Sequence, residues 1–79
     1  MLISLNSRAH RELVAEFVRL RKEVLDMNQR DFAKKLKTSQ SYVAQIEKGQ
    51  KHIPLFGFAP YCRALGVDPV DMFVRYCLR

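Results

Sequence analysis

The sequence has few cysteines, few acidic side chains and no long apolar run. Two cysteines, Cys62 and Cys77, do not make a disulfide framework, and we expect both to be free thiols in a reducing compartment. The longest apolar stretch, IPLFGFAPYC, is interrupted by Pro and Gly and is shorter than the roughly 20 residues of a membrane span. The first residues, MLISLNSR, lack the basic segment of a signal peptide. The sequence therefore predicts a cytoplasmic protein that does not enter a membrane.

The 79 residues are enough for one small domain, expected over 1–79, with residues 1–7 as a flexible extension. Basic side chains outnumber acidic ones by 14 to 8, for a net charge of +6. Residues 28–52 hold six basic and two acidic side chains and so carry +4 of that total. Such a charge suits nucleic acid or an anionic membrane surface, and equally a solvated face, so charge alone does not identify the partner.

Apolar residues at helical spacing predict five helices and no strand, which describes a compact all-α domain. The first helix is expected from its N-cap Ser7 to about Leu25. Its inward stripe is Leu13, Phe17, Leu20 and Val24, widened by Val14, Val18 and Leu25. The second helix starts at the N-cap Asn28, with Asp31 three residues on as in a capping box. It buries Phe32, Ala33 and Leu36.

The third helix is expected to begin at Ser39 or Thr38 and to bury Val43 and Ile46. Gly49 ends it in the left-handed conformation. Pro54 is expected in the first turn of the fourth helix, with Leu55, Phe58, Tyr61, Cys62 and Leu65 facing inward and Gly66 at its end. Asp68 and Pro69 open the last helix, which holds Met72, Phe73 and Tyr76.

The segment NQRDFAKKLKTSQSYVAQIEKG, residues 28–49, places two short helices only about three residues apart. So short a turn makes the helices cross steeply, and Ala33 is the small residue at their closest approach. Once Val43 and Ile46 are buried, the third helix presents Ser39, Gln40, Ser41, Ala44, Gln45 and Lys48 outward.

Those side chains match what the major groove of DNA displays. Gln can bond the N6 and N7 atoms of adenine together, Ser bonds either kind of group, and Ala44 or the Thr38 methyl can meet a thymine methyl. Gln29 stands at the start of the second helix, where free backbone amides can hold a phosphate.

The same segment, together with the later ALGVDPVDMF, resembles the XRE-like, phage Cro and repressor type of helix-turn-helix family over about residues 13–73. The resemblance implies a five-helix, lambda-repressor-like domain that binds double-stranded operator DNA as a homodimer and regulates transcription at the nucleoid. It implies no enzymatic activity and no cofactor. The spacings of His10, His52, Cys62 and Cys77 also fit no zinc site.

The resemblance implies that Gln29 clamps a phosphate, that Gln40, Ser41 and Gln45 read bases, and that a loop contacts the backbone through Lys48, Gln50, Lys51 and His52. Adding the outward face gives Ser39, Gln40, Ser41, Ala44 and Gln45 as predicted base contacts. The predicted backbone contacts are Asn28, Gln29, Lys37, Tyr42, Lys48, Gln50, Lys51 and His52, with Tyr42 equally placed to be a half-exposed prop beside the turn.

Two positions depart from the family pattern. Lys37 stands where Gly is usual in the turn, so either Lys37 adopts the left-handed conformation, at a cost of about 1 kcal/mol, or the turn is reshaped. Family members carry an Arg near the end of the first helix that pairs with the Glu of IEKG, here Glu47. Lys22 lies at the usual spacing from Gln29, whereas Arg21 lies in the usual LRKE context. Either Arg21 is the partner of Glu47 and the connection to Gln29 is one residue longer than usual, or Lys22 replaces the arginine. The planar fork of Arg21 favours Arg21.

One reading helix contacts too few base pairs to define a genomic site, which argues for a homodimer on a palindrome. Phe73, Tyr76 and Leu78 are core residues first and predicted interface residues second. We expect a repressor that regulates its own gene. The alternatives are an antitoxin-type module that binds a toxin protein and a controller of restriction-modification genes. An RNA-binding role is not expected, because no aromatic platform is evident.

Overall fold

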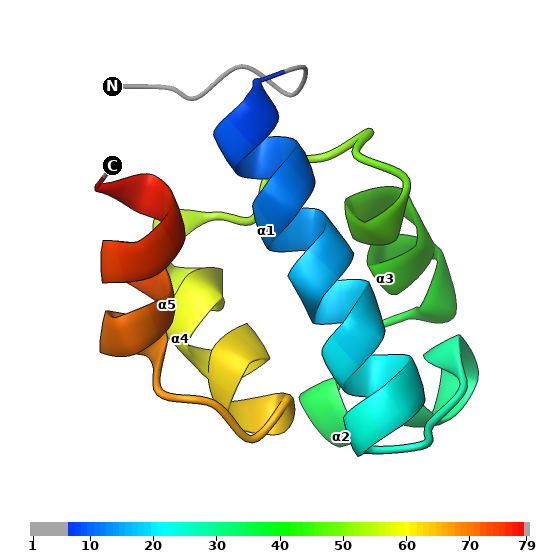
Figure 1. The fold of residues 1–79 in the computed structure, drawn as a ribbon. Helices are drawn as coiled ribbons and strands as arrows, with labels where there is room; N and C mark the ends of the chain where they lie inside the picture. The colour runs from blue at the N-terminus through cyan, green and yellow to red at the C-terminus, as the bar shows by residue number, and fades with distance from the viewer. Residues whose placement is uncertain (1–6, 79) are drawn as a thin grey trace.

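The computed structural model describes residues 7–78 and is all-α, as predicted, with no strand in that range. Figure 1 shows the arrangement. The helices are α1 (Arg8–Arg19), the π-helical turn η1 (Leu20–Val24), α2 (Gln29–Leu36), α3 (Gln40–Glu47), α4 (Leu55–Ala64) and α5 (Pro69–Cys77). No helix within residues 7–78 is long and apolar enough to cross a membrane. The predicted flexible extension lies outside the described residues, apart from Ser7.

Polar side chains cap the helices where the sequence places them. Each accepts a hydrogen bond from a backbone N–H of its own first turn, namely Ser7 from His10 (3.1 Å), Asn28 from Asp31 (2.7 Å), Ser39 from Tyr42 (3.1 Å) and Asp68 from Val70 (3.0 Å). Of the two candidates before α3, Ser39 and not Thr38 is the cap. Pro54 is the N-cap of α4 and so lies just before its first turn.

One apolar core joins all the helices. α1 packs against α3 on one side and α5 on the other, while α2 packs on α3 and α4. Tyr61, which is 1% exposed, lies at the centre, stacked on Phe17 at 5.0 Å and edge-on to Phe32 at 5.2 Å between ring centroids. The remaining members of the buried cluster are Leu13, Leu20, Ala33, Val43, Ile46, Cys62, Leu65 and Met72. Burial raises the pKa of the Cys62 thiol to about 11, so the group stays protonated and inert at neutral pH.

The end of the first helix differs from the prediction. η1 is a wide turn in which the N–H of Leu25 bonds the carbonyl of Leu20 at 2.9 Å, five residues back rather than four. Leu25 therefore takes the position against the core that the regular spacing assigned to Val24. The prediction that Val24 faces inward is wrong, because Val24 is 59% exposed.

The start of α4 also differs. The spacing predicts that Leu55 faces inward, but it is 77% exposed, and the neighbouring Phe56 is 91% exposed. Leu55 is the first residue of its helix, and a helical side chain leans toward the turn before it. Its side chain therefore extends past the edge of the core. Phe73 is also only partly covered, at 40% exposed, with its ring against Phe58 at 6.2 Å.

Candidate nucleic-acid interface

α3 has one fully buried face and one exposed polar face. Val43 and Ile46 are both 0% exposed and hold the helix against the core. The side chains left outside are those predicted to read bases, with Ser39, Gln40, Ser41 and Gln45 exposed and Ala44 half-exposed. Because Ser39 Oγ accepts the bond from Tyr42, its hydroxyl still has a proton to donate. The face therefore offers donors, acceptors and one methyl group over two turns.

The turn between α2 and α3 is held by a left-handed residue. Lys37 has φ 62° and ψ 45°, so of the two alternatives it is the left-handed conformation, and not a reshaped turn, that occurs. The N–H of Thr38 bonds the carbonyl of Ala33 at 2.9 Å and closes the end of α2. Ala33 itself is 2% exposed, so a larger side chain there would have to displace its neighbours in the core. The Lys37 side chain is exposed beside the start of α3.

A buried ion pair ties the end of the first helix to the end of α3. Arg21 donates to Glu47 through Nε at 2.6 Å and through Nη2 at 2.9 Å, a two-point contact that matches the guanidinium fork to the carboxylate. Their side chains are 5% and 6% exposed. The hydrogen bonds that Arg21 donates to Glu47 raise the pKa of Arg21 above its ordinary value. Arg21, and not the exposed Lys22, is therefore the partner of Glu47.

The π-helical turn accounts for this choice. A π-helical turn contains about one residue more than an α-helical turn. Arg21 is one residue further from Gln29 than the family spacing requires, and η1 accommodates that additional residue within the helix. Arg21 Nη1 also donates to the carbonyl of Met27 at 2.7 Å, which fixes the connection to α2. Nothing in the residue pattern indicates the wide turn except the conflict between spacing and context.

Gln29 joins the same network. Its Nε2 donates to Glu47 Oε1 at 2.8 Å, so the start of α2 is tied to the end of α3. Gln29, the predicted phosphate clamp, is thus half-buried and oriented by Glu47. Its second Nε2–H and its amide oxygen are left for other hydrogen bonds. Asn28 is exposed next to it, and its Oδ1 is used by the cap. This hydrogen-bonded network of Arg21, Gln29 and Glu47 therefore fixes the positions of α2 and α3 relative to the first helix.

Tyr42 serves as a half-buried support. Its ring packs against the core cluster, and burial raises the pKa of its hydroxyl. The ammonium of Lys51 lies 5.3 Å from the centroid of the ring, within cation–π range. Tyr42 therefore positions a cation of the loop beside the first turn of α3.

The loop after α3 carries the remaining predicted backbone contacts. Lys48, Gln50, Lys51 and His52 are all exposed. Gly49 has φ 73°, as predicted for the residue that ends α3, and the N–H of Gln50 bonds the carbonyl of Gln45 at 2.9 Å. The ring of His52 lies 5.6 Å from that of His10 on α1.

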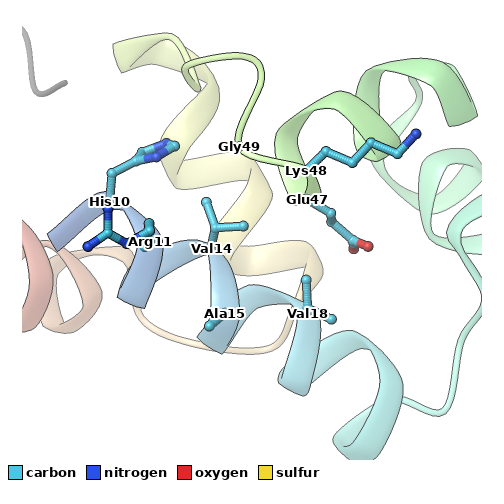
Figure 2. A pocket seen from close by; sticks show the side chains of 8 residues that line it. All are labelled: His10, Arg11, Val14, Ala15, Val18, Glu47, Lys48 and Gly49. Carbon is cyan, nitrogen blue, oxygen red and sulfur yellow. The ribbon is translucent and has the colours of Figure 1, made fainter. Parts of the chain in front are cut away.

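A groove runs between α1 and this loop (Figure 2), and it is lined by apolar residues of α1, namely Val14, Ala15 and Val18. The remaining lining residues are His10 and Arg11 of α1 and Glu47, Lys48 and Gly49 at the end of α3, with the Lys48 side chain extending away from α1 in this view.

A family model described as helix-turn-helix matches residues 19–72, which is most of the chain and includes every element from η1 to the middle of α5. No curated protein and no solved structure matches the sequence. The matched segment contains the polar face of α3, the left-handed turn and the Arg21–Glu47 pair. The chain belongs to the XRE-like, phage Cro and repressor type of helix-turn-helix family of DNA-binding regulators.

Proposed function

We propose that this protein is a sequence-specific transcription regulator that binds a palindromic operator as a homodimer, represses transcription and controls its own gene in the cytoplasm, at the nucleoid. The observation that carries this proposal is the two-faced character of α3. Two residues that are 0% exposed fix the helix, while its opposite face is polar and open. A helix held in this way fits the major groove, where base edges present donors and acceptors.

Base reading is assigned to five side chains of this face. Gln40 and Gln45 lie about one and a half turns apart and pair best with adenine, while the hydroxyls of Ser39 and Ser41 bond either kind of base edge. Ala44 contributes apolar contact, for which a thymine methyl is the natural partner.

Backbone contacts are assigned to groups on both sides of α3. Asn28 and Gln29 stand at the N-terminus of α2, where the helix dipole and free amides favour a phosphate. Lys37 and the loop residues Lys48, Gln50, Lys51 and His52 supply charge and hydrogen bonds along the neighbouring strand. Tyr42 acts by holding Lys51 in place.

Two copies are needed because one face of this size reads only a few base pairs. A two-fold dimer places its reading helices about 34 Å apart and doubles the information. Phe73 on α5 is 40% exposed and Leu78, just after the helix, is 64% exposed, which leaves both available to a second copy. Tyr76 is half-buried and packed against the core, so its share in an interface is smaller.

The proposal is tested by fluorescence anisotropy on the duplex upstream of the protein's own gene and on random duplex, at a low and a high salt concentration. We expect tight binding to the upstream duplex alone, with two chains per site. With about six phosphates neutralised by Lys37, Lys48 and Lys51 of two chains, affinity should fall by roughly a thousandfold between about 50 and 200 mM salt. Equal and weak binding to both duplexes would contradict the proposal and direct attention to a protein partner such as a toxin.

A further inference from the structure

One hydroxyl in the core is buried without a hydrogen bond. Within residues 7–78, the hydroxyl of Tyr61 is the one buried side-chain oxygen or nitrogen that meets no hydrogen-bond partner. The residue itself is 1% exposed. A buried hydroxyl in this state lowers stability unless a partner supplies the missing bond, and such groups are rare in native proteins. The position of this hydroxyl therefore indicates where a partner would bind.

Tyr61 also lines a groove behind the helix-turn-helix. This groove, which we call the Tyr61 groove, lies between α4 and the turn that joins α2 to α3, and its volume is about 210 Å³. It is lined by Gly57, Pro60 and Tyr61 of α4, by Leu36 and Thr38 at the turn, and by Tyr42 in the first turn of α3. None of the side chains assigned to base reading is among them. A molecule in the Tyr61 groove therefore leaves the outer face of α3 open to DNA.

The lack of a side chain at Gly57 leaves space in this groove. A β-carbon built on Gly57 would lie 3.5 Å from Cδ of Pro54 and 3.8 Å from the hydroxyl of Tyr42, which are ordinary van der Waals distances. Gly57 does not have a positive φ, so its backbone conformation does not require glycine. Glycine inside a helix also lowers stability relative to Ala. What Gly57 provides is therefore room between α4 and Tyr42.

The polar groups around the Tyr61 groove are neutral. Burial raises the pKa of Tyr61, and Glu47 and Tyr42 add to this effect, so the hydroxyl keeps its proton at neutral pH and both donates and accepts. Pro60 lies inside α4 and has no N–H, so the carbonyl of Phe56 loses its usual helical donor. A ligand that both donates and accepts a hydrogen bond suits these groups.

We propose that the Tyr61 groove binds a neutral molecule that consists of one aromatic ring with a hydroxyl group, and that this group bonds the Tyr61 hydroxyl. A cavity of about 150 Å³ holds benzene, so about 210 Å³ holds one ring with a small substituent. The rings of Tyr42 and Tyr61 and the side chain of Leu36 supply apolar walls for such a ring. A charged ligand is disfavoured, because no side chain of opposite charge lines the groove. This site goes beyond the proposed function and does not depend on DNA binding.

The test uses the full chain and three probes that share one ring. These are phenol, benzene, which lacks the hydroxyl, and benzoate, which carries a charge. Titrations are followed by NMR of the backbone amides, which reports both the dissociation constant and the place of binding.

Two variants keep the fold and change the Tyr61 groove. Tyr61→Phe keeps the ring that stacks on Phe17 and removes only a hydroxyl that meets no partner in the described part of the chain, so it should keep the native melting temperature. Gly57→Ala adds a methyl group at ordinary contact distances and so narrows the groove without disturbing its neighbours. Thermal melts followed by circular dichroism confirm that both variants are folded.

We expect phenol to bind the wild type saturably, with the largest shifts at the amides of Leu36, Thr38 and Gly57. Benzene should bind at least about fivefold more weakly, because it leaves the Tyr61 hydroxyl without a partner. Benzoate should cause no saturable shift. The preference for phenol over benzene should vanish in Tyr61→Phe, whereas Gly57→Ala should weaken the binding of both.

Four outcomes would overturn the proposal. One is equal binding of phenol and benzene by the wild type, and another is an undiminished preference for phenol in the folded Tyr61→Phe variant. Saturable shifts confined to exposed residues such as Phe56 and Val74 would show binding at another surface. The absence of any saturable binding would leave a water molecule as the partner of the Tyr61 hydroxyl. Because the titrations contain no DNA, each of these outcomes is separate from a failure of the proposed function.

Discussion

Residues 28–52 and residues 53–78 differ in what they expose. The first region carries +4 and presents polar side chains, whereas the second carries no net charge and presents six large apolar ones. Yet both regions contribute to the same buried cluster, with Phe32 and Ile46 from one and Tyr61 and Met72 from the other. The two regions therefore share one core and differ only in the surface that each exposes. One surface is basic and polar, and the other is neutral and apolar.

The largest contrast between the regions is expected at their ion pairs. Glu47→Ala should cost about 3–5 kcal/mol of unfolding free energy, because it leaves Arg21 buried without its carboxylate. Asp71→Ala removes an exposed pair with Arg75, at 3.6 Å, and should cost less than about 1 kcal/mol. Urea unfolding measures both. If the two substitutions lowered the free energy of unfolding by similar amounts, the buried network of Arg21, Gln29 and Glu47 would not be what stabilises the basic region.

The next effect separates the inner and outer faces of the helix-turn-helix. Ala33→Leu should lower stability by about 1–3 kcal/mol, since the residue is 2% exposed between α2 and α3. Ala44→Leu makes the same change on the half-exposed face of α3 and should leave the melting temperature nearly unchanged while weakening operator binding. Thermal melts followed by circular dichroism test the pair, and an unaltered melt for Ala33→Leu would refute the close packing.

Within the basic region, substitutions of base-reading residues should have a different effect on DNA binding from substitutions of backbone-contacting residues. Gln40→Ala is expected to cost roughly 1–3 kcal/mol on the preferred site and to relax selection at one base pair. Gln50→Ala removes the same amide from the loop and should leave base preference intact. Binding to a panel of single-base operator variants distinguishes these outcomes. If Gln40→Ala lowered affinity equally on every sequence, a reading role for Gln40 would be excluded.

The smallest effect is expected from a single loop cation. Lys51→Ala should weaken binding to operator and random duplex alike and reduce the slope of log K against log salt by about 0.9 for each phosphate that is no longer neutralised. Arg63→Ala removes an exposed cation from the neutral region and should leave the slope as it is. If Lys51→Ala and Arg63→Ala reduced the slope equally, DNA would be attracted by the net charge of the whole domain and not by the cations of residues 28–52.

Much of the fold follows from local chemistry in the sequence. The caps Ser7, Asn28, Ser39 and Asp68 could be predicted because a short polar side chain before an apolar stripe satisfies amides that the helix leaves open. For Lys37 the sequence left two alternatives, a left-handed residue or a reshaped turn, and the structure has the left-handed residue. The polar face of α3 followed from the burial of Val43 and Ile46, since a helix with one face in the core has only the other to offer.

The errors fall where register or helix ends decide the outcome. Leu55 matches the stripe of α4, but spacing does not report that the first turn extends past the core. Val24 matches the stripe of the first helix, but the wide turn at Leu20–Val24 moves Leu25 into its place. Neither feature has a local residue signature. Which of Arg21 and Lys22 meets Glu47 also depends on that turn, so spacing and context conflicted, and only the planar fork of Arg21 favoured the residue that makes the contact.

The π-helical turn has a consequence for comparing sequences. It lets the chain carry one more residue between two fixed points, the guanidinium of Arg21 and the start of α2, without moving either of them. An alignment that keeps the spacing to Gln29 constant would place Lys22 opposite Glu47, although Arg21 is the residue that makes the contact. In this chain a matching contact in space is therefore found by its geometry and not by counting residues back from Gln29.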